Sequence, residues 1–233
     1  MEWALSVYAV RGSSKRKLDS IERALNLQSA DILLDLGCGP GVLLKRFAPK
    51  VEKIIGIDFA KACINSSKKL LENDKCPNFS LYSCDFETEK LPLKDDSVSK
   101  ILFVDVIEHL RDEKCVLKEI HRVLKPGGIV VITTLPNKGS IFYLFYELLK
   151  RLKIKPKNLM DEVDHVKLYS VSSLKRALSQ AKLIPLKTQT YRILAPLFEL
   201  CKCKDNDYLD FSLLTKTPLG NAFASGILMV AKK

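Results

Sequence analysis

The chain has 233 residues, of which 47% are hydrophobic, and this suits one α/β domain with a large core. No linker rich in proline, glycine or serine divides it, so we expect a single domain over residues 1–233. It holds no apolar run of roughly 18 residues and no apolar signal-peptide core, which argues against a transmembrane segment and predicts a cytoplasmic protein. The net charge of +11 favours an anionic partner: nucleic acid, an anionic lipid surface or a charged substrate.

Residues 1–30 are expected to form an N-terminal cap that precedes the first strand. A basic run occupies residues 11–17, and apolar residues recur at helical spacing from Leu18 to Leu27. This pattern predicts a capping pair of helices placed before the first strand.

The next segment is an apolar run, residues 32–36, that ends in the alternating glycines Gly37, Gly39 and Gly41. It predicts a buried parallel strand that feeds a loop and a helix. Glycine is required where the backbone turns with unusual dihedrals or where a ligand approaches without a Cβ in the way. Asp35 lies near the carboxyl end of the strand, where open α/β sheets bind ligands. The spacing is too narrow for the dinucleotide fingerprint, which argues against NAD; a plain strand-to-helix turn is the alternative.

The two following strands also end in acidic residues. The strand at 53–58 ends in Asp58, which is 58 − 37 = 21 residues after Gly37. A carboxylate about 20 residues after the first glycine can accept both ribose hydroxyls of a nucleoside. The strand at 79–84 is followed by Asp85 and Phe86, a pair suited to an adenine amine and ring face. An ordinary turn acid is the alternative for Asp85 alone.

Hydrophobic periodicity and turn residues then predict the remaining elements. A Lys-Pro-Gly-Gly turn separates a predicted helix from the fifth strand. In chain order we expect a strand at 100–104, a helix at 115–124, strands at 129–134 and 186–194 with a helix at 171–181 between them, and a last strand at 225–232.

A lid insertion is expected at residues 137–170, after the fifth strand. It combines the apolar and aromatic run at 141–146 with five basic residues between Lys150 and Lys157. Such a segment is buried on several sides, lines an apolar acceptor pocket, or lies in a membrane interface with its lysines toward lipid phosphates.

These motifs together resemble those of class I S-adenosylmethionine (SAM)-dependent methyltransferases, in particular the small-molecule and quinone-biosynthesis group. The resemblance implies an α/β fold: a Rossmann-like, seven-stranded, mostly parallel sheet with an antiparallel last strand, helices on both faces and a helical lid. It also implies SAM as the cofactor. The matching segments are Asp35–Gly41, Gly56–Phe59, Cys84–Phe86, Asp105–Leu110 and Leu124–Ile129.

By the same resemblance, the strand ends supply the cofactor site. Gly37 and Gly39 are expected to pass close to the methionine moiety, Asp58 to hold the ribose, and Asp85 with Phe86 to meet the adenine. The full predicted cofactor-binding set is Asp35, Gly37, Cys38, Gly39, Gly41, Asp58, Phe59, Asp85, Phe86 and Asp105.

His109 and His165 are the candidate catalytic bases, because imidazole titrates near working pH and an oxygen acceptor loses a proton on methylation. With Asp105 and Glu108 they resemble the Glu-x-x-Glu-His plus distant His set that binds a divalent ion in certain quinone-pathway and small-RNA ribose O-methyltransferases. Asp105 replaces the first Glu of that set, and whether a metal binds is left open. The alternative is that Glu108 and His109 only cap the following helix.

The first hypothesis for function is methyl transfer from SAM to a small-molecule or lipid-like acceptor, with peripheral membrane contact as an open question. The alternatives are an RNA methyltransferase, favoured by the charge, and a SAM-binding regulatory protein that has lost turnover.

Overall fold

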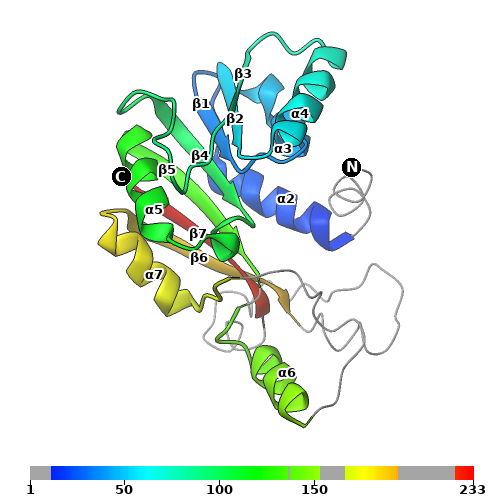
Figure 1. Ribbon diagram of the computed structural model, residues 1–233, viewed down its shortest axis with the longest axis vertical. Helices are drawn as coiled ribbons and strands as arrows, with labels where there is room; N and C mark the ends of the chain where they lie inside the picture. The colour runs from blue at the N-terminus through cyan, green and yellow to red at the C-terminus, as the bar shows by residue number, and fades with distance from the viewer. Residues whose placement is uncertain (1–11, 136, 153–165, 194–223) are drawn as a thin grey trace.

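Seven strands form one sheet in the order β3-β2-β1-β4-β5-β7-β6 (Figure 1). The first five pair in parallel, and β7 runs antiparallel to both β5 and β6. The predicted mostly parallel sheet with an antiparallel last strand is therefore confirmed. The strands are β1 (Ile32–Leu36), β2 (Lys53–Asp58), β3 (Phe79–Ser83), β4 (Val98–Val104), β5 (Leu124–Thr134), β6 (Ile184–Ile193) and β7 (Ala224–Lys232).

Helices cover both faces of this sheet (Figure 1). One core cluster joins the inner sides of α2, α3 and α4 to one face, and a second joins α5 and α7 to the other. The helical segments are α2 (Gly12–Leu25), α3 (Val42–Phe47), η1 (Ala48–Lys50), α4 (Lys61–Asn73), η2 (Ile107–His109), α5 (Glu113–Val123), α6 (Ile141–Arg151) and α7 (Val171–Gln180).

The central strands are apolar along their length because both faces are buried. In β4, Ile101 and Phe103 belong to the cluster beneath α5 and α7, whereas Leu102 and Val104 belong to the cluster beneath α2 to α4. A parallel strand with helices on both sides has this continuous apolar pattern rather than an alternating one. The carboxyl ends of β1, β2, β3, β4 and β5 consequently lie along one edge of the sheet.

The computed structural model describes residues 12–135, 137–152, 166–193 and 224–233. The predicted cap contributes α2, which packs on the sheet, and the predicted lid contributes α6; residues 1–11 of the cap and 153–165 of the lid, including His165, lie outside the described residues. Among the described helices, none combines the length and the apolarity that crossing a bilayer requires.

Candidate functional site

The loop after β1 is built on three glycines with left-handed backbone: φ is +80° at Gly37, +51° at Gly39 and +89° at Gly41. A Cβ on Gly37 would lie 2.4 Å from Cγ2 of Val106, and one on Gly41 would lie 2.7 Å from Oγ of Ser67. A Cβ on Gly39 would meet no atom within 4 Å. Gly37 and Gly41 therefore serve close packing, while the backbone of Gly39 borders open space that a ligand can enter.

Asp58, at the end of β2, fixes this loop. Its Oδ2 accepts a hydrogen bond from the Gly39 N–H at 2.9 Å, and its Oδ1 accepts one from the Ala60 N–H at 2.9 Å. The N–H groups of Gly37 and Cys38 donate to the carbonyl oxygen of Ile57 at 2.7 and 3.1 Å. The predicted ribose acid and the predicted glycine loop are thus direct neighbours.

Asp35 and Cys38 lie beneath the loop. The Asp35 side chain is 1% exposed, and its Oδ2 accepts no hydrogen bond from a described residue. Burial, with the neighbouring Asp58 carboxylate, raises the pKa of Asp35 to about 7. Burial and the same two carboxylates also raise the pKa of the Cys38 thiol. Cys38 therefore stays protonated and is no nucleophile.

At the end of β3, Asp85 is exposed and organises its own turn. Its carboxylate accepts from the Glu87 N–H at 3.2 Å and from Oγ1 of Thr88 at 3.0 Å. Phe86 is only 6% exposed and belongs to the core, whereas Phe59, just beyond β2, is 71% exposed. Phe59 is thus the ring at this edge that a planar base can reach most readily, and the adenine-binding role of Asp85 and Phe86 stays a prediction.

At the end of β4, Asp105 pairs with Lys17 of α2. The other carboxylate oxygen of Asp105 accepts from Oγ1 of Thr133 at 2.8 Å, and the residue has left-handed backbone with φ +54°. The Lys17 side chain is 12% exposed, and its ammonium lies 5.5 Å from the centre of the Tyr191 ring. A buried cation therefore faces the same edge of the sheet as the glycine loop.

Lys17 is the site residue that the sequence analysis missed. A signal for it exists, because Lys17, Ile21 and Leu25 are spaced four residues apart and share one face of α2. Ile21 and Leu25 are fully buried in the core. The periodicity thus singles out Lys17 from the basic run as the lysine that points inward.

Glu108 joins three loops at this edge. Its carboxylate accepts from the Leu135 N–H at 3.2 Å, and its carbonyl oxygen accepts from the N–H groups of Val166 and Lys167, both at 3.0 Å. Burial, with the Asp105 carboxylate, raises the pKa of Glu108 to about 8. The chain immediately after His165 is thus anchored beside His109, which is exposed at the end of η2.

No metal-binding group is found among the described residues. Within the described ranges, no three His, Cys, Asp or Glu side chains are grouped so as to hold a metal ion. The metal set therefore stays a prediction that depends on His165.

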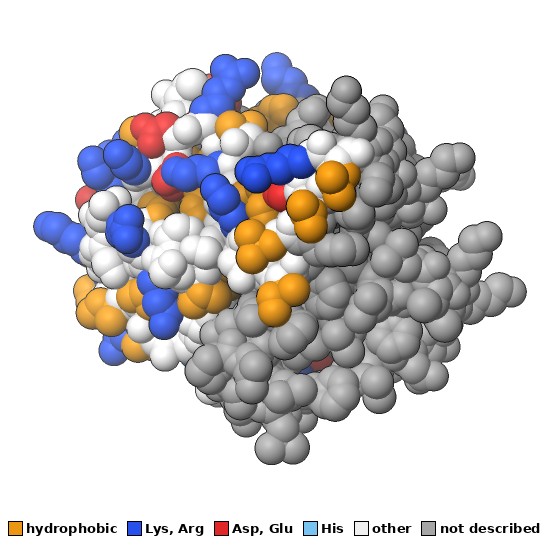
Figure 2. Space-filling view, turned by 90° about the horizontal axis from the view of Figure 1, so that it is seen from below, with side chains coloured by type: hydrophobic (Ala, Val, Ile, Leu, Met, Phe, Trp, Pro, Cys, Tyr) orange, Lys and Arg blue, Asp and Glu red, His pale blue; other side chains and the backbone are white. Residues whose placement is uncertain are grey.

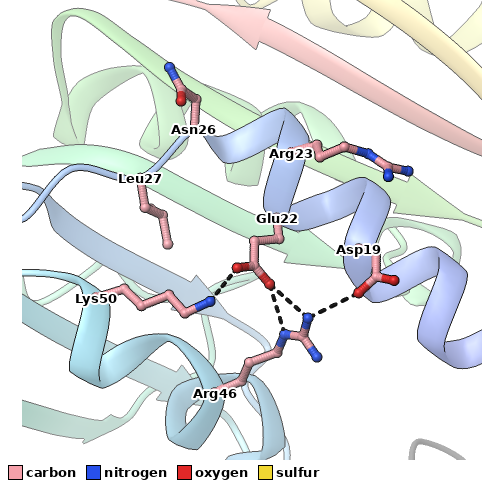
Figure 3. A pocket seen from close by; sticks show the side chains of 7 residues that line it. All are labelled: Asp19, Glu22, Arg23, Asn26, Leu27, Arg46 and Lys50. Carbon is pink, nitrogen blue, oxygen red and sulfur yellow. Dashed lines mark hydrogen bonds and ion pairs between the residues drawn. The ribbon is translucent and has the colours of Figure 1, made fainter.

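A hollow of about 750 Å³ lies between α2 and the α3–η1 segment (Figure 3). Four of its charged residues form ion pairs: Arg46 contacts Glu22 at 2.7 Å and Asp19 at 3.1 Å, and Lys50 also pairs with Glu22. α2 runs from Lys17, at the carboxyl edge, toward Leu25, which precedes the start of β1. We interpret the hollow as part of the packing of α2 rather than of the site.

Comparisons with known proteins point to methyltransferases. The family described as "Methyltransferase domain" matches residues 27–196. A ubiquinone biosynthesis O-methyltransferase from Dechloromonas aromatica is 29% identical over 198 residues, which are 83% of this chain and 82% of that protein. The homologue from Bradyrhizobium is 30% identical over 58% of this chain, and the match spans about half, 52%, of that relative's length.

Solved structures share the fold. The crystal structure of a putative methyltransferase from Bacillus halodurans aligns with a TM-score of 0.67 at 18% identity, over 94% of this chain and 99% of that one. Geranyl diphosphate C-methyltransferase from Streptomyces coelicolor, in complex with Mg²⁺, geranyl diphosphate and S-adenosyl-L-homocysteine, aligns with a TM-score of 0.63 at 15% identity, over 94% and 80% of the two chains.

Proposed function

The chain belongs to the methyltransferase domain family, and from this premise we propose that it transfers a methyl group from SAM to a small-molecule or lipid-like acceptor. One observation carries the proposal: the open backbone of Gly39 is held by Asp58, at the same sheet edge as the Lys17–Asp105 pair. A nucleoside with an amino-acid tail needs these features together, namely a cradle without a Cβ, an acceptor for hydroxyls, and charges of both signs.

Asp58 and Phe59 are the proposed contacts of the nucleoside. Each carboxylate oxygen of Asp58 accepts one backbone N–H and keeps a second lone pair, so the side chain is able to accept ribose hydroxyls without releasing the loop. The exposed ring of Phe59 offers a face for the adenine.

Lys17 and Asp105 are the proposed contacts of the amino-acid end. The methionyl group of SAM is a zwitterion with an ammonium and a carboxylate. Asp105 offers the anion for the first and Lys17 the cation for the second. The existing ion pair keeps both charges compensated before the cofactor arrives, which limits the cost of burying either one alone.

When bound, SAM supplies a methyl group on a sulfonium, so transfer is a displacement that needs little covalent help from the protein. The residues of the chain hold the two reactants aligned and exclude water. An oxygen acceptor also requires that its proton be removed. The proposed base is His109, which is exposed beyond the end of β4, with His165 as the second candidate.

The names of relatives support the proposed class of acceptor. Several curated relatives that match this chain, among them those from Bradyrhizobium and Dechloromonas aromatica, are named as O-methyltransferases of ubiquinone biosynthesis, which supports a small oxygen acceptor. We propose this class and leave the molecule itself open.

Two measurements test the proposal. Calorimetry with SAM and with S-adenosylhomocysteine is expected to detect binding to the purified chain. Incubation with methyl-labelled SAM and a lysate divided into lipid, small-molecule, RNA and protein fractions is expected to label the lipid or small-molecule fraction. Label in RNA alone would make the chain an RNA methyltransferase. Binding without label in any fraction would favour a SAM-binding regulatory protein.

A further inference from the structure

The helix α6 carries an exposed apolar row, which we call the α6 stripe and define as Ile141, Leu144, Leu148 and Leu152. These side chains are between 46 and 62% exposed and follow one another by three, four and four residues, so they share one side of the helix. Single exposed aliphatic residues are ordinary on protein surfaces, but a row of four on one helix face is not. From the side on which α6 lies in Figure 1, hydrophobic side chains gather at the surface beside Lys and Arg (Figure 2).

The start of α6 is anchored firmly to the body of the protein. Asn137 is buried and bridges Tyr169, and the Lys138 N–H donates to the Tyr169 carbonyl oxygen at 2.8 Å. Oγ of Ser140 accepts from the Tyr143 N–H at 3.1 Å at the first turn. The stripe is thus presented at a defined angle from the end of β5.

Basic residues outnumber acidic ones in the part of the sequence that carries the stripe. Five basic residues and no acidic one occur between Leu148 and Met160. Arg151 and Lys138 are exposed next to the stripe, and Lys167 pairs with Glu113. The one acidic residue of α6, Glu147, accepts a hydrogen bond from the Tyr143 hydroxyl at 3.2 Å.

We propose that the α6 stripe docks this protein on an anionic lipid bilayer. An interfacial helix places aliphatic side chains just below the headgroups and cations at the level of the lipid phosphates, and it needs neither the length nor the uniform apolarity of a spanning helix. Four aliphatic side chains cover far less than the roughly 800 Å² per partner of a stable dimer. The net charge of +11 further opposes self-association through this basic segment.

Docking through α6 would orient the candidate site relative to the bilayer. The helix begins four residues after Asn137, beyond the end of β5, at the sheet edge where Asp105 and Glu108 lie. The acceptor side of the site then faces the bilayer, where an amphiphilic acceptor resides. This last step rests on the proposed function, whereas membrane binding itself does not.

Flotation of the full chain with lipid vesicles tests the docking. The chain is expected to float with vesicles of phosphatidylcholine mixed with phosphatidylglycerol, to bind poorly to phosphatidylcholine alone, and to lose binding at high salt. The double variant Leu144→Ser/Leu148→Ser is expected to lower the partition coefficient by about 10-fold or more, since each buried CH₂ contributes about 0.8 kcal/mol.

Leu186→Ser is the matched control, because Leu186 is 58% exposed on β6, away from the stripe, and it should float as the unchanged chain does. Equal flotation of the stripe and control variants, or equal binding to both lipid compositions, would overturn the proposal. So would a loss of self-association in the stripe variant, measured by sedimentation velocity, without any vesicle binding by the unchanged chain. Urea unfolding checks that both variants are folded, and flotation without methyl transfer would count against the proposed function only.

Discussion

Asp58 and Gly39 are joined by a hydrogen bond of 2.9 Å from the Gly39 N–H to Oδ2 of the Asp58 side chain. This bond ties the loop that follows β1 to the end of β2. The side chain proposed to hold the ribose is therefore also the one that shapes the cradle.

Asp58→Ala is accordingly expected to disturb the conformation of the loop and to weaken ligand binding. It removes two hydrogen bonds to a charged acceptor, each worth about 1.5 to 3 kcal/mol, and the proposed ribose contacts with them. Calorimetry should show S-adenosylhomocysteine binding weakened by about 100-fold, which corresponds to about 3 kcal/mol. The control is Asp74→Ala, which removes an exposed acid that pairs with the exposed Lys45. Equal affinity of the two variants would remove Asp58 from the site.

The substitutions Gly37→Ala and Gly39→Ala should distinguish the role of the loop in close packing from its role in ligand binding. The Cβ of Gly37→Ala would lie 2.4 Å from Cγ2 of Val106, so we expect urea unfolding to show a loss of about 2 kcal/mol or more. The Cβ of Gly39→Ala would meet no neighbouring atom, so this variant should lose only about 1 kcal/mol of stability, from the strain of a left-handed backbone at a residue with a side chain. Binding of S-adenosylhomocysteine to Gly39→Ala should nevertheless weaken by at least about 10-fold, because the new methyl group occupies the proposed ligand space.

A second substitution tests whether the clash with Val106 causes the loss of stability in Gly37→Ala. Val106→Ala, placed in the Gly37→Ala background, should recover part of the lost stability because it removes the two methyl groups that clash. No recovery would mean that the loss comes from the backbone alone.

The sequence predicted the elements whose signals are local. Apolar runs bounded by glycines and acids located the strands at the edge of the site, and the resemblance supplied the mostly parallel sheet with its antiparallel last strand. The first residues of two strands were predicted incorrectly, because pairing with a neighbouring strand extends each of them beyond its apolar run. β4 begins at Val98, not at residue 100, because Oγ of Ser99 accepts from the Ile32 N–H at 3.0 Å and donates to Asp31 at 2.7 Å, which binds this polar residue to β1. β6 begins at Ile184, not at residue 186, because a register irregularity between Pro185 and Lys187 lets the edge strand include a proline.

The site was predictable only in part. Residues at strand ends were found because each follows an apolar run directly. Lys17 lies in a helix far from them in the chain, and its contact with Asp105 arises only when α2 packs across the sheet. The burial of Phe86, which leaves Phe59 as the more exposed of the two phenylalanine rings, likewise depends on how the loop after β3 folds into the core.

Asp35→Asn is expected to change how stability depends on pH. Burial, with the Asp58 carboxylate, raises the pKa of Asp35 to about 7 from its ordinary value of 3.8. The folded protein therefore holds this proton more tightly than the unfolded chain does. The resulting contribution to the free energy of unfolding is fully present below a pH of about 4 and is lost as the pH rises through about 7.

Urea unfolding between about pH 5 and about pH 8 measures this effect. Relative to the unchanged chain, Asp35→Asn should gain up to about 3 kcal/mol across this range, at 1.36 kcal/mol for each pKa unit. Burying the amide of the Asp35→Asn variant has a cost that does not depend on pH. It therefore does not affect the comparison, which concerns how the difference in the free energy of unfolding changes with pH. Asp74→Asn, at an exposed site, should show no such trend. A flat difference for Asp35→Asn would mean that Asp35 is ionised throughout.

Lys17→Met tests the proposed contact with the amino-acid end of SAM. The substitution keeps most of the aliphatic stem and removes the ammonium, so S-adenosylhomocysteine should bind about 10-fold more weakly, as expected for one charge-assisted bond. The affinity for 5′-methylthioadenosine, which has the nucleoside but no amino acid, should be unchanged. Lys17→Arg should restore part of the difference, and Lys45→Met, at an exposed ion pair, should have no effect. Equal losses for both ligands would show that Lys17 acts on the fold alone.

His109→Ala tests the proposed base. Label transfer into the accepting fraction should fall by about 100-fold or more, the usual contribution of general base catalysis, while calorimetry finds the affinity for S-adenosylhomocysteine unchanged. His121→Ala is the matched control, since His121 lies on α5 and burial lowers its pKa. If His109→Ala and His121→Ala turn over equally fast, His109 takes no part in proton removal, and His165 becomes the residue to substitute next.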